Sequence, residues 1–379
     1  MNMCKKNSNT LYINPGTKTV DFRMRENQDD LGFWSIKSVY LPDSVITIDD
    51  GAFMFCFQLE NIRMSNSIRR IGWHAFDCCH KLSGIHFPNS LKRIDPEAFK
   101  DCDSLVSITI PDSVEEIGRQ AFMRCHKLST IHLSDSLHRI DSEMFRNCKS
   151  LISITIPNSV KSIFPGAFSG CTSLTNITIP ESVRYISSTA FSGCTMLTNF
   201  IIPIAVIEIG SRAFWSCKHL DKVTISQSVT HIGNRAFSYC SSIRSICVEK
   251  ENKFYDSRED CNAIIHTATN TLIQGCSRTI IPNSITCIGE GAFSGCDKIK
   301  SIAIPNSVIK IKDEAFKGCM GLKSISIPAS ITEIGKDVFV GCQQLKEIFV
   351  PIGSKRRFTG LLPSINCNFI IELPNLNNH

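Results

Sequence analysis

The sequence predicts a mainly β repeat solenoid of about fourteen coils, because two patterns return every 23 residues. A Phe is followed three residues later by a Cys in twelve places, and the first nine pairs are evenly spaced. A short apolar strand pattern recurs with the same period. The twelve pairs are Phe53/Cys56, Phe76/Cys79, Phe99/Cys102, Phe122/Cys125, Phe145/Cys148, Phe168/Cys171, Phe191/Cys194, Phe214/Cys217, Phe237/Cys240, Phe293/Cys296, Phe316/Cys319 and Phe339/Cys342.

Residues 105–127 represent one coil, which begins with a short strand. Ile108 and Ile110 alternate with polar residues, and Pro111 ends the strand because it cannot donate to the ladder. Equivalent strands that run in the same direction must pair in parallel, with adjacent coils about 4.8 Å apart. The fourteen strand positions are centred on Val39, Ile62, Ile85, Ile108, Ile131, Ile154, Ile177, Phe200, Val223, Ile246, Thr279, Ile302, Ile325 and Ile348.

The rest of the coil leads the chain back to the next strand. Val114 to Ile117 form a second short extended piece, and Gly118 permits a turn. Phe122 and Cys125 have the spacing of one helical or 3-10 turn that folds over the core. This corner is wider than the strand, so we expect a right-handed curved stack with its strands on the inner face.

The consensus Leu-x-x-Ile-x-Ile-Pro-x-Ser-Val-x-x-Ile-Gly-x-x-Ala-Phe-x-x-Cys resembles the BspA-like, or Treponema-type, leucine-rich repeat. The resemblance covers residues 36–350. It implies a curved leucine-rich solenoid of the kind found in many bacterial surface proteins and some protozoan ones. There it is associated with adhesion to host or bacterial proteins. It implies no catalytic residues, so we expect a protein that is not an enzyme.

The repeat divides the chain into three parts. Residues 36–350 form the leucine-rich solenoid, residues 1–35 an N-terminal cap, and residues 351–379 a C-terminal cap and tail. With 42% hydrophobic and 20% charged residues, the chain has the composition of an ordinary folded protein.

One coil is longer than the others. Cys240 and Cys296 are 56 residues apart, which corresponds to one coil of 23 residues and one of 33. The longer coil, at about residues 247–279, contains two apolar runs around a small polar turn within residues 261–276. This pattern predicts a β-hairpin that projects from the stack and is either a structural insert or a ligand loop.

Both ends carry patterns that fit capping elements. Two short apolar segments around Asn14–Gly16 predict an edge hairpin at the N-terminus. Residues 353–362 predict a short capping helix with Ser354 at its start. The following residues 370–373 are expected to pair as a last strand.

Charge and hydropathy exclude several classes of partner. A formal net charge of +6 with mixed signs indicates no nucleic-acid partner, and no stretch is long and apolar enough for membrane insertion. The first residues lack the apolar run of a secretory signal, which suggests a cytoplasmic protein. The family resemblance suggests the cell surface or secretion instead. We expect a monomer.

The nineteen cysteines are mostly a feature of the repeat. Equivalent Cα atoms on neighbouring coils lie about 5 Å apart, within reach of a disulfide. However, a run of nine equivalent thiols cannot pair completely, and each lies beside a core Phe. The pattern therefore predicts a ladder of reduced, buried and inert thiols. Cys247, Cys261, Cys276 and Cys287 surround the long coil without a Cys-x-x-Cys pair, so no metal site is predicted.

No residue pattern predicts catalysis or a cofactor. His80 and His126 belong to a duplication of two coils and are about 9.6 Å apart, too far to share a metal. The recurring serines have no copy with a neighbouring His and acid, so we expect them to bond to the backbone.

The candidate binding residues lie on the outward positions of the inner strand face. Tyr40, Arg63, His86 and His132 are the aromatic, Arg and His side chains of that column near its N-terminal end. Aromatic and Arg side chains dominate recognition energies, so we predict that these four residues bind a protein ligand. The alternative is a structural or scaffolding repeat protein that acts inside the cell.

Overall fold

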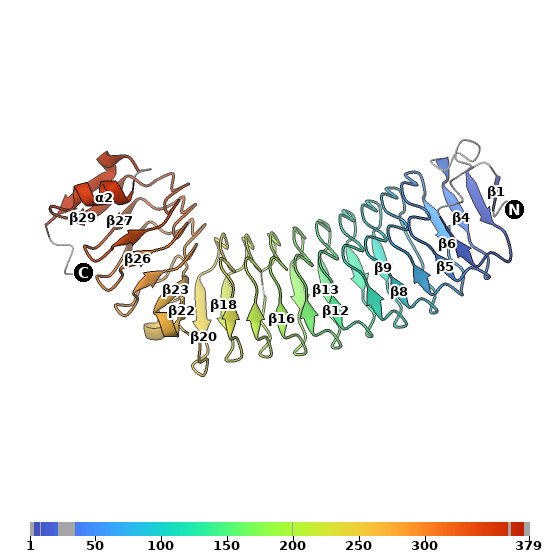
Figure 1. Ribbon diagram of the computed structural model, residues 1–379, viewed down its shortest axis with the longest axis horizontal. Coiled ribbons are helices and arrows are strands. Elements are labelled where there is room, and N and C mark those ends of the chain that lie inside the picture. The colour runs from blue at the N-terminus through green and yellow to red at the C-terminus, as the bar shows by residue number, and fades with distance from the viewer. Residues whose placement is uncertain (1–3, 8, 22–34, 199, 363–364, 375–379) are drawn as a thin grey trace. The chain divides into compact units, whose positions relative to one another are not determined.

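The computed structural model describes residues 4–7, 9–21, 35–198, 200–362 and 365–374. They form a β-solenoid of about fourteen coils, which confirms the fold class expected from the sequence. The chain divides into two compact units, Met1–Leu197 and Thr198–His379. Within each unit, Figure 1 shows the short strands of successive coils lying side by side.

In the first unit, one face of the stack is built from three-residue strands. The central residue of each strand is buried between two outward side chains, so Ile108 and Ile131 enter the core while Thr109 and His132 are exposed. Ile108 pairs in parallel with Ile131, which is the equivalent residue of the next coil. The strands are β4 (Ser38–Tyr40), β6 (Asn61–Arg63), β9 (Ser107–Thr109), β11 (Thr130–His132), β13 (Ser153–Thr155) and β15 (Asn176–Thr178).

A second face consists of two-residue strands, as predicted for Val114 to Ile117. Ile117 is buried, whereas Glu116 pairs with Arg93 (2.8 Å) and Arg139 (3.2 Å) of the coils on either side. The strands are β5 (Thr47–Ile48), β7 (Arg70–Ile71), β8 (Arg93–Ile94), β10 (Glu116–Ile117), β12 (Arg139–Ile140), β14 (Ser162–Ile163) and β16 (Tyr185–Ile186).

The corner after the second face is a chain of turns. The N–H of Cys125 donates to the carbonyl of Phe122 (3.2 Å), the bond expected in a 3-10 turn. Gln120 and Arg124, however, have φ angles of 57° and 60°, so the corner cannot continue as a helix. The N–H of Phe122 instead donates along the stack to the carbonyl of Met144 in the next coil (3.0 Å).

The recurring Phe and Cys hold neighbouring corners together. Phe99 and Phe122 are fully buried, and their rings stack with centroids 5.5 Å apart. The thiol of Cys125 donates to the carbonyl oxygen of Phe99 in the preceding coil, at an S···O distance of 3.2 Å. The same contact occurs, at 3.0–3.2 Å, for Cys79, Cys102, Cys148, Cys171, Cys194, Cys240, Cys319 and Cys342. The repeated Cys is therefore a hydrogen-bond donor as well as a small apolar residue.

The described part of the N-terminal cap is a further coil with an added edge strand. β1 (Cys4–Asn7) pairs antiparallel with β2 (Thr10–Ile13), and β2 pairs in parallel with β4. β3 (Thr19–Val20) pairs in parallel with β5 on the second face. The edge hairpin expected around Asn14–Gly16 is therefore wrong, because its two segments belong to different faces of one coil. Residues 22–34 lie outside the described part of the chain.

Among the described coils of the first unit, the coil around Ile85 has no strand on the first face. Ile85, a predicted strand centre, is outside any strand. Phe87 replaces the smaller side chain of other coils, and its ring packs edge-on against Phe99, with centroids 5.6 Å apart. In the second unit Phe200 packs edge-on against Phe214 at 4.7 Å and is also outside any strand. We attribute both losses to the added ring, which displaces the backbone from the ladder.

The second unit repeats the two faces and contains the longer coil. Its strands are β17 (Glu208–Ile209), β18 (Lys222–Ile225), β19 (His231–Ile232), β20 (Ser245–Val248), β21 (Tyr255–Asp256), β22 (Ile264–His266), β23 (Thr271–Gln274), β24 (Cys287–Ile288), β25 (Ser301–Ala303), β26 (Lys310–Ile311), β27 (Ser324–Ser326), β28 (Glu333–Ile334), β29 (Glu347–Pro351) and β30 (Ile370–Leu373). Its described helical segments are η3 (Arg258–Asp260), η4 (Thr267–Thr269), α2 (Lys355–Leu361) and η5 (Cys367–Phe369).

The longer coil contains the expected hairpin, formed by β22 and β23. The hairpin does not project, because β23 also pairs in parallel with β24 and so belongs to the sheet of the second face. Ile264, Ile265 and Leu272 are fully buried and complete the core. Thr279, a predicted strand centre, lies outside any strand.

The C-terminal elements match their predictions. Helix α2 begins after Ser354 and buries Phe358, and β30 pairs in parallel with β29. The carboxylate of Glu372 accepts the N–H of Lys355 (2.8 Å), which ties the helix to the last strand. Among the described residues, none of the helices has the length and apolar character needed to cross a bilayer.

Replacing one ring of the Phe stack should destabilise the first unit. Phe122→Ala leaves a cavity between two stacked rings, so we expect the free energy of unfolding to fall by about 3–5 kcal/mol. Urea denaturation followed by circular dichroism measures the loss. Phe254→Ala is the control, because this side chain is 43% exposed. A loss for Phe122→Ala no larger than for the control would contradict the role of the stack.

Candidate binding groove

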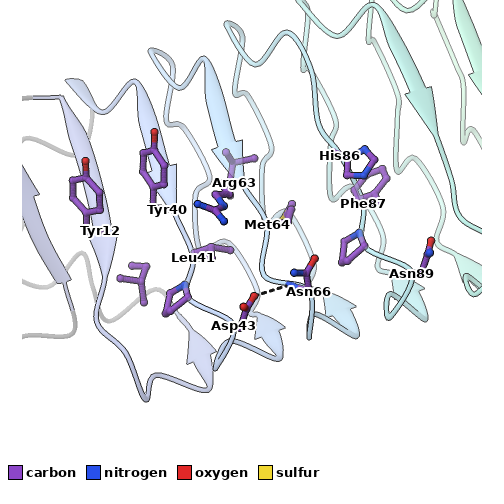
Figure 2. Close-up of a pocket in the computed structure, with 14 residues that line it drawn as sticks. Tyr12, Tyr40, Leu41, Asp43, Arg63, Met64, Asn66, His86, Phe87 and Asn89 are labelled. Atoms are coloured by element: carbon purple, nitrogen blue, oxygen red, sulfur yellow. Dashed lines mark hydrogen bonds between the residues drawn. The ribbon is translucent and has the colours of Figure 1, made fainter.

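A groove of ≈ 780 Å³ lies on the first face at the start of the first unit. Figure 2 shows one rim formed by Tyr12, Tyr40, Arg63 and His86, which come from successive coils. The parallel pairing of β2, β4 and β6 places the first three residues in line, since Tyr12 is the register partner of Tyr40 and Tyr40 that of Arg63. His86 follows from the coil that lacks a strand.

The two tyrosines form a stacked pair. The ring centroids of Tyr12 and Tyr40 are 5.0 Å apart with 14° between the planes, and the residues are 44% and 40% exposed. One face of each ring therefore covers the other ring, and both hydroxyl groups lie at the same edge of the groove (Figure 2). An exposed aromatic pair of this kind can contribute substantially to binding a partner, because Tyr combines apolar area with a polar group.

Arg63 supplies the positive charge of this rim. Its side chain is exposed and makes no hydrogen bond or ion pair with any residue that the structure describes. Arg70 of the next strand on the second face differs, since it contacts Asp49 at 3.0 Å and Asp50 at 2.6 Å. No acidic group of the described chain therefore neutralises the guanidinium of Arg63.

The floor and the far rim differ in polarity. Leu41 and Phe87 are buried in the floor, and the N–H of Asn66 donates to the carboxylate of Asp43 (3.2 Å) along the far rim. The floor is formed by Leu41, Met64 and Phe87, and the far rim by Asp43, Asn66 and Asn89. The groove therefore offers an apolar floor between a rim of aromatic and basic groups and a rim of amides and one carboxylate.

The structure brings three of the four predicted binding residues together. Tyr40, Arg63 and His86 line the groove, whereas His132 is exposed on β11 and is not among its lining residues. Sequence reasoning missed Tyr12, which was assigned to the cap. The signal was present, because Leu11, Tyr12 and Ile13 repeat the alternation of β4.

A cluster at the Phe corner holds acidic and histidine side chains. The Nδ1 of His74 lies 2.9 Å from the carboxylate of Asp77 and 3.7 Å from that of Glu97. Lys100 contacts the same Glu97 oxygen at 2.7 Å. Burial, together with the charge of Asp77, raises the pKa of the neighbouring Cys78 thiol to about 12, so this thiol is protonated at neutral pH. These contacts describe an ion-pair network that is satisfied within the chain.

His80 and His126 are linked through one acid. The two imidazoles lie two coils apart, and each Nδ1 approaches a different oxygen of Asp103 in the coil between them, at 3.1 and 2.6 Å. The ring of Phe57 stacks on His80, with centroids 5.5 Å apart. The carboxylate therefore bridges the pair, which the duplication in the sequence did not predict.

Comparison with known proteins supports one family. The model of the BspA-type leucine-rich repeat region, which consists of six repeat copies, matches residues 32–152, 138–259 and 273–360. This chain belongs to the BspA-type leucine-rich repeat family. Such repeat proteins commonly take part in protein interactions or lie at surfaces, and they are typically not enzymes.

Three solved structures resemble this BspA-type chain. A leucine-rich repeat protein from Bacteroides ovatus is 27% identical, with a TM-score of 0.69 over 98% of this chain and 90% of that one. A leucine-rich cell surface protein from Faecalibacterium prausnitzii is 26% identical, with a TM-score of 0.52 over 98% and 92%. A leucine-rich repeat protein from Eubacterium ventriosum, 24% identical with a TM-score of 0.55 over 65% and 66%, shares the fold. None of the curated proteins matches.

The cysteines of the BspA-type repeats are free thiols throughout the part of the chain whose side chains are described. Burial raises the pKa of the Cys171 thiol to about 12, and it raises that of Cys148 and Cys194 well above the ordinary value. Thiols held in this way are protonated and unreactive at neutral pH. Cys247 differs, because it is exposed on β20.

The raised thiol pKa values predict a loss of stability in alkali. The unfolded chain ionises its thiols near pH 8.5, whereas the folded chain holds Cys171 protonated until about pH 12. Stability is therefore complete below about pH 8.5 and falls above it, by up to about 1.4 kcal/mol per pH unit for each thiol whose pKa is raised in this way. Urea midpoints at pH 7.5 and about pH 10 measure the slope.

A triple variant tests the origin of this slope. Replacing Cys148, Cys171 and Cys194 by Ala should reduce the alkaline loss, even though the variant is less stable at every pH. Cys247→Ala is the control, because that thiol is exposed to solvent in the folded chain as well. A triple variant with the slope of the original chain would rule out the buried thiols as its cause.

Proposed function

We propose that this chain is a non-enzymatic module for protein binding and adhesion, and that the groove of the first unit is its binding site. The observation that carries the proposal is the meeting of Tyr12, Tyr40, Arg63 and His86 on one rim of a groove of ≈ 780 Å³. Exposed Tyr and Arg side chains next to apolar surface are the residues that most often dominate protein recognition.

A scaffolding role inside the cell remains the second candidate. It is favoured by the free thiols, which suit a reducing compartment. Most of these thiols are buried, however, and burial raises the pKa of several of them, such as Cys171. A buried thiol also resists oxidation outside the cell. Both roles use the same binding face, so they differ in location and not in the site.

A capture experiment tests the site. The intact chain is immobilised, captured proteins are identified, and the affinity of a purified partner is measured for variants. Tyr40→Ala combined with Arg63→Ala should weaken that affinity at least about tenfold, because both side chains are exposed in the groove. Circular dichroism checks that the variant is folded.

His132→Ala is the matched control. It removes an exposed side chain from the same face, outside the groove, and should leave the affinity unchanged. Unchanged binding by the double variant, or equal losses in both variants, would exclude the groove as the site.

A further inference from the structure

We propose that the groove binds an extended acidic segment of its partner, with a carboxylate of that segment paired to Arg63. This inference rests on the proposed function and adds the chemistry of the partner. Three features of the described residues carry it: the unpaired guanidinium, the orientation of the tyrosine pair, and a stretch of free backbone at the groove.

The guanidinium of Arg63 selects an anionic group. In the same unit Arg70, Arg93 and Arg139 each contact a carboxylate of the chain. Arg70 lies 2.6 Å from Asp50. Arg93 and Arg139 lie 2.8 and 3.2 Å from Glu116. Arg63 has no such partner among the described residues and lies at the centre of the rim. The planar guanidinium presents paired donors that match the two oxygens of a carboxylate.

The tyrosine pair adds hydrogen-bonding groups to the rim. Tyr12 and Tyr40 cover one face of each other, with ring centroids 5.0 Å apart, and their hydroxyl groups lie at the same edge of the groove. Phenol hydroxyls in line with Arg63 add donors for the oxygens of an acidic chain.

Free backbone at the groove indicates that the ligand is a polypeptide. Gly84, Ile85, His86 and Phe87 form no backbone hydrogen bond within the described part of the chain, because this coil has left the strand ladder. Of these four residues, His86 and Phe87 line the groove, and a Cβ at Gly84, just before them, would meet nothing within 4 Å. Unpaired N–H and C=O groups bind the complementary groups of an extended peptide.

The far rim restricts where the acidic side chain can lie. Asp43 repels a carboxylate placed opposite the tyrosines, whereas Asn66 and Asn89 beside Arg63 and His86 are neutral. Amide side chains can both donate to and accept from a peptide backbone. The acid of the partner is therefore expected at the level of Arg63, between the two asparagines and the rim.

Two synthetic peptides test the proposal on the intact chain. One contains about six Gly-Glu repeats, which in an extended chain place a carboxylate on the same side about every 6.6 Å. The other replaces each Glu by Gln, and both carry the same fluorescent dye. Fluorescence anisotropy at low salt should show at least about tenfold tighter binding of the acidic peptide.

Arg63→Gln should abolish the preference for the acidic peptide. The control is Arg119→Gln, because Arg119 is also exposed and unpaired among the described residues but lies outside the groove. This control should keep the preference. Three results would overturn the proposal. The original chain could bind both peptides equally, Arg63→Gln could keep the preference for the acidic peptide, or Arg119→Gln could lose that preference to the same extent.

The outcomes separate this inference from the proposed function. One outcome is that the double variant of Tyr40 and Arg63 loses affinity for the captured partner while the original chain binds both peptides equally. In that case the groove is the binding site, but the inference of an acidic segment is wrong. If neither assay depends on the groove residues, both proposals are wrong.

Discussion

The contacts between neighbouring corners are the constraint on which the rest of the structure depends. The N–H of Phe99 donates to the carbonyl of Ala121 in the next coil (2.8 Å), and its own carbonyl accepts the N–H of Cys102 (3.3 Å) and the thiol of Cys125 (3.2 Å). Each corner therefore satisfies its buried polar groups only when the adjoining coils are present. The longer coil has Gly275 at the position of the Phe. The N–H of Gly275 donates to the carbonyl of Ala292 (2.8 Å), which is the bond that the N–H of Phe99 makes to Ala121.

The period made most of the fold predictable from the sequence. Strand centres such as Ile108 and the second extended piece ending at Ile117 follow from apolar positions that recur in every coil, and helix α2 follows from its local pattern. The turns at the corner did not follow, because Gln120 and Arg124 adopt left-handed backbone conformations that usually indicate Gly. Only the contacts of the whole stack hold these side chains there.

The candidate site was predictable in part, for a related reason. An outward row of side chains is fixed by the alternation of each strand, so Tyr40, Arg63 and His86 could be aligned without a structure. The groove beside them could not be predicted. Phe87 stands where other coils have a smaller apolar residue. The hydrophobic pattern of the sequence is therefore unchanged at this coil, although the structure has no strand there.

Phe87 links the core of the first unit to the proposed binding groove. A perfectly repeated face offers equivalent positions on every coil, so a partner would have no reason to prefer one register over the next. The ring of Phe87 packs on Phe99 inside the stack, and the backbone beside it leaves the ladder. That interruption, together with the tyrosine pair on the coils before it, makes this position unlike its neighbours on the face. Under the proposed function, a substitution in the core thus defines the register at which an otherwise regular solenoid binds its partner.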